Sequence, residues 1–399
     1  MNSQDTIRPQ LERMKVRALG LGVAGVALCA LLGFGFPNQD QFYRSYLFAY
    51  IFWLGIPLGC TAILMLHNLT GGWWGHPIRR LLEAGTRTFG LMAALFIPVW
   101  MGMSHLYPWA RPREVAADPL LQYKAPYLNL RFFTLRAAIY FAIWLLLAYF
   151  LNKWSAEQDH AAEERIAARL STRLEAMSGP GIILWGIAVT FSSVDWVMSL
   201  EPRWFSTIYG MIFMMVGALT AMSFVLFVLR MLSDREPIQD AVSPSQFNDL
   251  GNLLLAFVML WAYLSFDQFL VIWAGNTKEE IPWYMSRAFG GWAAVAVVLL
   301  VLHFALPFFL LLQRPLKRRL RALSALAGML VVMSSVDVYW LVVPSWSKDG
   351  PHVHLLDILA VIGIGGLWIG TFFWQLAKWP LLPQHDPRFE GALEHEHGD

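Results

Sequence analysis

The chain has 399 residues, of which 57% are hydrophobic and 15% are charged, and its formal net charge at pH 7 is +2. A soluble domain typically carries about 25% charged residues, so this composition predicts an integral membrane protein rather than a soluble enzyme. No basic segment interleaved with aromatic residues is present, so nothing indicates a nucleic-acid partner. The two cysteines, Cys29 and Cys60, lie inside apolar runs. This excludes a disulfide framework, a cysteine-ligated iron–sulfur cluster and a covalently attached haem on this chain.

Ten apolar runs along the chain are each long enough to cross a bilayer as a helix, and strand-like alternation is absent. The polar N-terminal segment lacks the pattern of a signal peptide, so we expect the first run to be retained as a span. In chain order the predicted spans cover residues 17–36, 45–69, 86–106, 131–152, 180–200, 205–232, 247–274, 286–313, 319–343 and 353–378. The sequence therefore predicts an all-α integral membrane protein with ten transmembrane helices.

Between the fourth and fifth spans, residues 153–179 are rich in Ala, Glu and Arg. This composition predicts a surface helix that ends at Ser178, Gly179 and Pro180. A solvated spacer is one role for such a helix, and a docking surface for a cytoplasmic partner is the alternative. Most Lys and Arg residues lie in the tails and in the loops on this same side of the membrane, so we expect both termini to be cytoplasmic.

Two pairs of matching segments indicate an internal repeat. The segments at 192–204 and 334–346 both read SSVD, then six residues, then Pro-x-Trp, and the segments at 126–133 and 282–289 share Pro, Arg and Phe at the same spacing. We interpret spans two to five and six to nine as two copies of a four-helix bundle related by a parallel repeat and flanked by spans one and ten. The expected divisions are residues 1–44, 45–204, 205–350 and 351–399.

Polar side chains inside the predicted spans are the candidate functional residues, because a charge in the bilayer costs about 2.5–3.5 kcal/mol on insertion scales. Three aspartates lie in the outer half of outward-running spans, and hydroxyl, amide and imidazole groups lie at helical spacing from them or elsewhere in the bundle. The candidates are Asp195, Asp267, Asp337, His105, Ser192, Ser193, Ser334, Ser335, Tyr263, Gln268, Glu201 and His303.

Two roles are open for these residues. The aspartates either accept hydrogen bonds that hold helices together, or they belong to a proton path built from carboxylates and hydroxyls. A haem held by two histidines is disfavoured, because His67 and His303 are inner while His105 is outer and alone. We expect no metal site.

The ten spans, the repeat and the segments SSVDWVMSLEPRWFSTIYG (192–210) and WAYLSFDQFLVIWAGNTKEEIPWY (261–284) resemble the ActF membrane subunits of bacterial alternative complex III. Those subunits belong to the wider polysulfide-reductase, or NrfD-like, group. The resemblance runs from the second span to the tenth. It implies a location in the bacterial cytoplasmic membrane and a place in a complex that oxidises quinol and passes electrons to a cytochrome or an oxidase.

The resemblance also implies how the work is divided. The c-type haems and iron–sulfur clusters lie on partner subunits: multihaem cytochromes, an iron–sulfur subunit and an NrfD-like paralogue, ActC, that is the better candidate for binding quinol. The subunit similar to this chain carries no cofactor, contacts lipid, and is implied to act as a scaffold and a proton conductor through Asp195, Asp267, Asp337 and His105.

Two other functions stay open from the sequence. The chain itself binds quinol in one of them, with His105 paired with Asp195 or Asp267 as the acceptor of the quinol protons. In the other it is an independent secondary transporter, although the repeats lack broken helices at matching positions.

Overall fold

The computed structural model describes residues 4–36, 38–161, 163–236 and 238–383. It is 83% helical, and the described residues form no strand. Ten of its helical segments are long and apolar enough to cross a membrane, which confirms the predicted all-α, multi-pass class. Eight spans are continuous helices: α1 (Gln4–Gly35), α2 (Gln39–Thr70), α9 (Leu130–Asp159), α10 (Glu164–Trp196), α11 (Tyr209–Leu232), α13 (Pro244–Gly275), α18 (Leu320–Val342) and α19 (Leu355–Leu376).

The other two spans are interrupted. The third is built from α3 (Arg79–Thr86), α4 (Phe89–Leu95), α5 (Ile97–Met101) and α6 (Met103–Leu106). The eighth consists of α15 (Gly291–Val298), a π-helical turn (Leu299–Ala305) and α16 (Leu306–Leu311). Short helices form the connections: α7 (Pro112–Ala117), α8 (Pro119–Lys124), α12 (Ile238–Ala241), α14 (Ile281–Ala288) and α17 (Arg314–Lys317).

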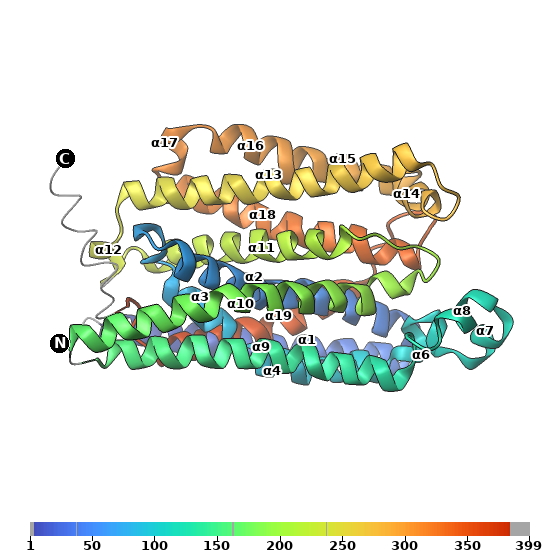
Figure 1. Ribbon diagram of the computed structural model, residues 1–399, viewed down its shortest axis with the longest axis horizontal. Helices are drawn as coiled ribbons and strands as arrows, with labels where there is room; N and C mark the ends of the chain where they lie inside the picture. Colours follow the sequence, from blue (N-terminus) through green and yellow to red (C-terminus); the bar gives the residue numbers. More distant parts are fainter. Residues whose placement is uncertain (1–3, 37, 162, 237, 384–399) are drawn as a thin grey trace.

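The long helices run side by side along the longest axis of the molecule (Figure 1). Within residues 39–196, α2 contacts α3 and α10, and α9 contacts α10 and α4. Within residues 209–342, α11 contacts α13 and α18, and α13 contacts α16. The two groups meet where α2 packs against α11. Helix α1 lies against α19. Only 22% of the α1 span is buried, so most of this helix faces away from the rest of the protein.

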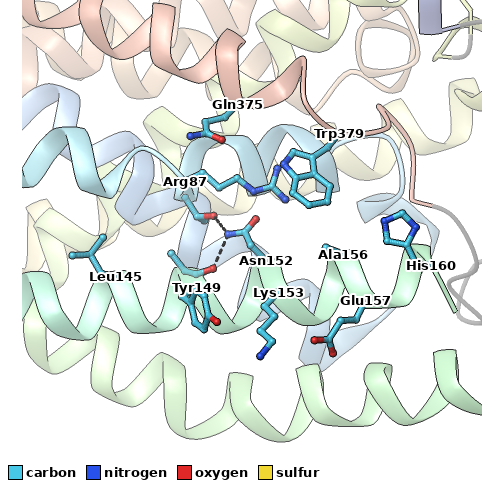
Figure 2. A pocket seen from close by; sticks show the side chains of 12 residues that line it. Arg87, Leu145, Tyr149, Asn152, Lys153, Ala156, Glu157, His160, Gln375 and Trp379 are labelled. Atoms are coloured by element: carbon cyan, nitrogen blue, oxygen red, sulfur yellow. Dashed lines mark hydrogen bonds between the residues drawn. The ribbon is translucent and has the colours of Figure 1, made fainter.

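The predicted surface helix at residues 153–179 is wrong. Helix α9 continues to Asp159, and α10 begins at Glu164 and passes through Pro180 without ending (Figure 2 shows the last part of α9). Breaking α10 here would leave backbone groups without partners near the membrane, so the helix tolerates a proline that would otherwise end it. The residues before it also have a buried face, which includes Ala167, Leu170 and Leu174.

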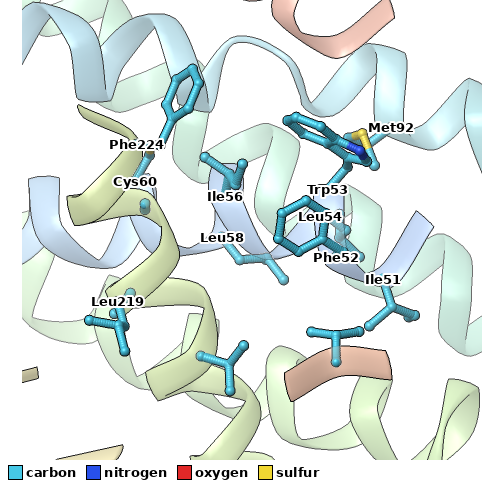
Figure 3. Close-up of a cluster of buried hydrophobic side chains, with 14 of the residues drawn as sticks. Ile51, Phe52, Trp53, Leu54, Ile56, Leu58, Cys60, Met92, Leu219 and Phe224 are labelled. Carbon is cyan, nitrogen blue, oxygen red and sulfur yellow. The ribbon is translucent and has the colours of Figure 1, made fainter. Parts of the chain in front are cut away.

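The central contact of the fold is the crossing of α2 and α11, where both helices present glycine. A Cβ atom added to Gly59 would lie 2.1 Å from the carbonyl oxygen of Gly217, and one added to Gly217 would lie 2.9 Å from that of Gly55. Small residues four apart allow helix backbones to approach this closely in a membrane, where van der Waals packing replaces the hydrophobic drive. Large side chains fill the space on either side of the crossing, including Leu58 of α2 and Leu219 and Phe224 of α11 (Figure 3).

Close packing at glycine also joins α1 to α19. A Cβ atom on Gly22 would lie 2.4 Å from the backbone nitrogen of Leu367, and one on Gly25 would lie 2.7 Å from the Cα atom of Gly363. Helix α19 is tied in turn to α2, because the Trp53 indole donates a hydrogen bond of 2.9 Å to the carbonyl oxygen of Val361.

Replacing Gly59 by alanine is expected to lower the apparent melting temperature of the detergent-purified protein. The new methyl group has a backbone oxygen in its place, and such overpacking costs about 1–3 kcal/mol. The matched control is Gly90→Ala, because nothing lies within 4 Å of a Cβ at Gly90. Fluorescence-detected thermal melts check both variants, and equal melting temperatures for them would contradict the close α2–α11 contact.

Candidate functional site

Asp195 lies at the end of α10 and forms a buried ion pair with Arg136. Its side chain is fully buried, and the Arg136 guanidinium from α9 grips both carboxylate oxygens, with Nε 2.7 Å from Oδ2 and Nη2 3.0 Å from Oδ1. The Tyr140 hydroxyl donates a third bond of 2.7 Å to Oδ2. A two-point grip of this kind is among the strongest and most directional interactions in proteins. The aspartate therefore fastens α10 to α9.

The serines around Asp195 do not line the carboxylate. Ser192 and Ser193 donate to the carbonyl oxygens of Val189 and Thr190 in their own helix, at 3.0 and 2.7 Å. The spacing of these residues predicts a shared polar face, but each hydroxyl is taken up by its own backbone, as serines in helices commonly are.

Asp337, the equivalent residue in the second SSVD segment, has different surroundings. It is buried in α18, and the one side-chain bond it accepts within the described part of the chain comes from the Trp261 indole of α13, at 2.9 Å. No cation pairs with it there. The hydroxyl of Ser334, one turn earlier, is also buried and has no hydrogen-bond partner among the described residues.

His303 contacts the face of the same indole. Its ring stacks on Trp261, with 4.4 Å between ring centroids and 22° between planes. The side chain is fully buried, and in the described structure neither ring nitrogen has a hydrogen-bond partner. It belongs to the π-helical turn of the eighth span, a distortion that is frequent at functional sites. One tryptophan thus joins a buried carboxyl to a buried imidazole.

Glu201 belongs to a separate group that lies between the end of α10, α14 and the end of α18. It accepts a bond of 2.9 Å from Arg287 of α14 and one of 3.0 Å from Ser345. Arg287 is fully buried, and it also donates 3.0 Å to the carbonyl oxygen of Leu341 at the end of α18. Burial lowers the pKa of the Arg287 guanidinium, and the charge of Glu201 opposes that shift.

The structure does not bring His105 to Asp195 or to Asp267. His105 lies in α6, where its Nδ1 is 2.6 Å from Asp40 of α2 and its ring stacks on Tyr43. About a third of its side chain is exposed, at 32%. The predicted acceptor pair for quinol protons is therefore not formed.

No hydrogen bond joins Tyr263 and Asp267, four residues apart on α13, in the described structure. The Tyr263 side chain is 63% exposed and points out of the bundle, while Asp267 is half-buried and makes no hydrogen bond within the described chain. Gln268 is buried and lies 3.2 Å from Ser206 and 3.3 Å from Tyr284. Ser335 is half-buried beside Ser334.

Sequence reasoning missed the partners of these groups. Neither Arg136 nor Arg287 is among the candidate residues of the sequence analysis, and Trp261 is not among them either. It also missed a buried ionic cluster at the opposite end of the first unit, where Glu83 of α3 accepts from Arg79 at 3.1 Å and from Arg80 at 2.6 Å. The spacing of these three residues, three and four apart on one helix, was the signal that could have found it.

Among the described residues, no three or more His, Cys, Asp or Glu side chains form a group that could hold a metal ion. His67, near the end of α2, is 3.2 Å from the carbonyl oxygen of Gly72 and packs edge-on against Trp74.

The chain matches no model of a known protein family, and no curated protein matches it.

Removal of the charge at Asp195 is expected to destabilise the protein, whereas removal of the charge at Asp337 is not. Asp195→Asn leaves the Arg136 charge without its counter-ion, a change that costs about 3–5 kcal/mol when a buried pair is broken. Asp337→Asn keeps an acceptor for the Trp261 indole and leaves no cation unpaired, so its melting temperature should stay close to that of the parent.

Thermal melts of the two purified variants check this difference. Adding Arg136→Gln to Asp195→Asn should recover part of the lost stability, because it removes the orphaned charge. A loss of similar size in both single variants would contradict the distinction between a paired and an unpaired aspartate.

Proposed function

We propose that this chain is a cofactor-free membrane subunit of a bacterial quinol-oxidising complex of the alternative complex III type, and that it conducts protons through residues 205–350. The observation that carries the proposal is the buried Asp337, which has an indole N–H as its one described side-chain partner. A carboxyl group without a counter-ion takes up and releases a proton without breaking an ion pair. Buried acids of this kind mark proton relays in membrane proteins.

The contrast with Asp195 supports this assignment. The two aspartates occupy equivalent places in the SSVD repeat, but three donor atoms of Arg136 and Tyr140 hold Asp195. Protonation of Asp195 would break its two-point ion pair with Arg136, so we assign Asp195 a structural role. In this proposal the ion pair stabilises residues 45–204, and protons pass through residues 205–350.

Polar groups continue inward and outward from Asp337. On the inner side, Lys317 of α17 donates 2.5 Å to Asn252 of α13, which lies nine residues, or about 14 Å, before Trp261 along the helix. On the outer side, Arg287 reaches Leu341, one turn and about 6 Å beyond Asp337. Both separations along the helices are longer than a hydrogen bond. Proton conduction therefore requires water molecules between Asn252, Asp337 and Arg287.

The redox chemistry is assigned to the partner subunits. The described structure holds both cysteines as buried free thiols, in α1 and α2. The proposal therefore places the c-type haems and iron–sulfur clusters on the neighbouring cytochrome and iron–sulfur subunits, and the quinol on the NrfD-like paralogue. This chain would move the protons that their electron transfer drives.

Direct quinol binding by this chain is less well supported. A cavity of about 250 Å³ lies between α2, α10, α11 and α13, and its walls are apolar, with Met211, Met214 and Met215 among them. A quinol tail is compatible with such walls, but no acid or histidine lines this cavity to take the protons. An independent transporter is also disfavoured, because the interrupted third and eighth spans occupy different positions in the two repeats.

In the assembled complex, Asp337→Asn is expected to lower the number of protons moved per electron while quinol oxidation in the presence of an uncoupler stays within about twofold. The amide cannot carry a proton as the acid does, and it still accepts from Trp261. The measurement is pH change against electron count in liposomes that contain the purified complex.

Asp267→Asn is the matched control, because that aspartate lies in the same outer half but has no buried partner. It should leave the proton count unchanged. An unchanged count in Asp337→Asn would remove the support for conduction through this unit.

A further inference from the structure

A cavity of about 710 Å³ opens at the end of the bundle where α9 and α19 finish. Figure 2 shows it between the last turns of α9, the residues that follow α3, and Gln375 and Trp379 of the C-terminal region. None of the residues assigned to proton movement lines it. It is a separate site on the first unit.

Arg87 forms the charged wall of this cavity. Its guanidinium lies 4.5 Å from the ring of Trp379, and its Nη2 atom is buried without a hydrogen-bond acceptor among the described residues. That atom faces the Glu83 carboxylate at 3.5 Å, which is an ionic contact but too long for a good hydrogen bond. The Arg87 side chain itself lines the cavity, so its other N–H groups are the donors it offers to a ligand there.

The charge of the neighbouring cluster explains why Arg87 is poorly satisfied. Glu83 is bound more closely by Arg79 and Arg80, at 3.1 and 2.6 Å, and the Asp159 carboxylate pairs with Arg80. Among the described residues, Glu83 is thus shared by three guanidinium groups, and its contact with Arg87 is the longest of the three. An anion in the cavity would give Arg87 a closer charged partner than Glu83 provides.

The polar surroundings of Arg87 offer a second type of contact. Asn152 of α9 donates 2.8 Å to the hydroxyl of Thr86, and its own Oδ1 atom is buried and accepts no hydrogen bond in the described structure. Lys153 and Glu157 lie at the mouth, four residues apart, where their opposite charges offset each other. The site therefore presents a cation for a phosphate and an acceptor for a hydroxyl.

The deeper wall is apolar. From His160 the cavity extends along α9 past Ala148 to Leu145, a distance of about 22 Å at 1.5 Å per residue. Half of a hydrocarbon core is about 15 Å thick, so the cavity passes from the headgroup level into the apolar layer. Its polarity changes in the same direction as that of a membrane lipid. A free phosphate would leave the apolar part unused.

We propose that this cavity binds one anionic phospholipid with a hydroxylated headgroup, of the phosphatidylglycerol class. The phosphate lies against Arg87, a headgroup hydroxyl donates to Asn152, and an acyl chain follows α9 toward Leu145. Basic pockets between transmembrane helices at the cytoplasmic surface bind anionic headgroups in this manner. The lipid phosphate gives Arg87 a closer anionic partner than Glu83, and the acyl chain fills the space between α9 and α19.

The test measures lipid retention by the full chain, purified in mild detergent, using native mass spectrometry and thermal melts with added phosphatidylglycerol, phosphatidylcholine or glycerol phosphate. The parent should keep one phosphatidylglycerol and should be stabilised by it more than by phosphatidylcholine. Arg87→Gln should weaken this binding about tenfold, as expected for the loss of one charged contact of about 1.4 kcal/mol. Arg169→Gln, an exposed arginine on α10, should leave it unchanged.

A second variant covers the case in which Arg87→Gln does not fold. Leu145→Trp fills the apolar end of the cavity and should expel the lipid, while Leu146→Trp, on the neighbouring residue that does not line the cavity, should not. Equal binding of the two lipids, or retention that survives Leu145→Trp, overturns the proposal. Stabilisation by glycerol phosphate equal to that by phosphatidylglycerol overturns the lipid assignment and leaves a site for a free phosphate.

Discussion

The crossing of α2 and α11 at glycine is the contact on which the rest of the structure depends. Helix α2 is the most buried span, with 89% of its window inside the protein, and it contacts α3, α10, α11 and α19. In a membrane the lipid tails are as apolar as leucine, so helices associate through close packing rather than through exclusion from water. Gly59 and Gly217 permit that packing where the two halves of the chain meet. This contact fixes the position of the two groups of helices, and of their buried polar side chains, relative to each other.

Two identical tetrapeptides carry out different tasks in this protein. Both SSVD segments place an aspartate inside the bundle, where burying its charge is unfavourable. Arg136 compensates for the burial of Asp195 with a two-point ion pair, which joins α9 to α10. Among the described residues, Asp337 accepts one side-chain hydrogen bond, from the indole N–H of Trp261, whose ring face is covered by His303. The presence or absence of one arginine thus distinguishes the surroundings of the two aspartates.

Local patterns predicted the spans but not the partners. Hydropathy is a property of neighbouring residues, so the ten helices followed directly from the sequence, and so did the depth of Asp195 and Asp337. Their partners lie 59 and 76 positions away, on helices whose rotation about their own axes no local pattern describes. The same limit explains why His105, expected near Asp195, pairs with Asp40 instead. At residues 178–180 a strong local stop signal was wrong, because the surrounding membrane protein favours an unbroken helix over a turn.

The pairing of α1 with α19 has a consequence for how the protein is made. The glycine faces that join them lie more than three hundred residues apart in the chain, at Gly25 and Gly363. The translocon therefore releases α1 into the lipid long before the helix that covers it has been synthesised. Until then α1 is held only by its weaker contact with α2. A chain that stops before α19 therefore leaves the glycine face of α1 uncovered and the Trp53 indole without its acceptor.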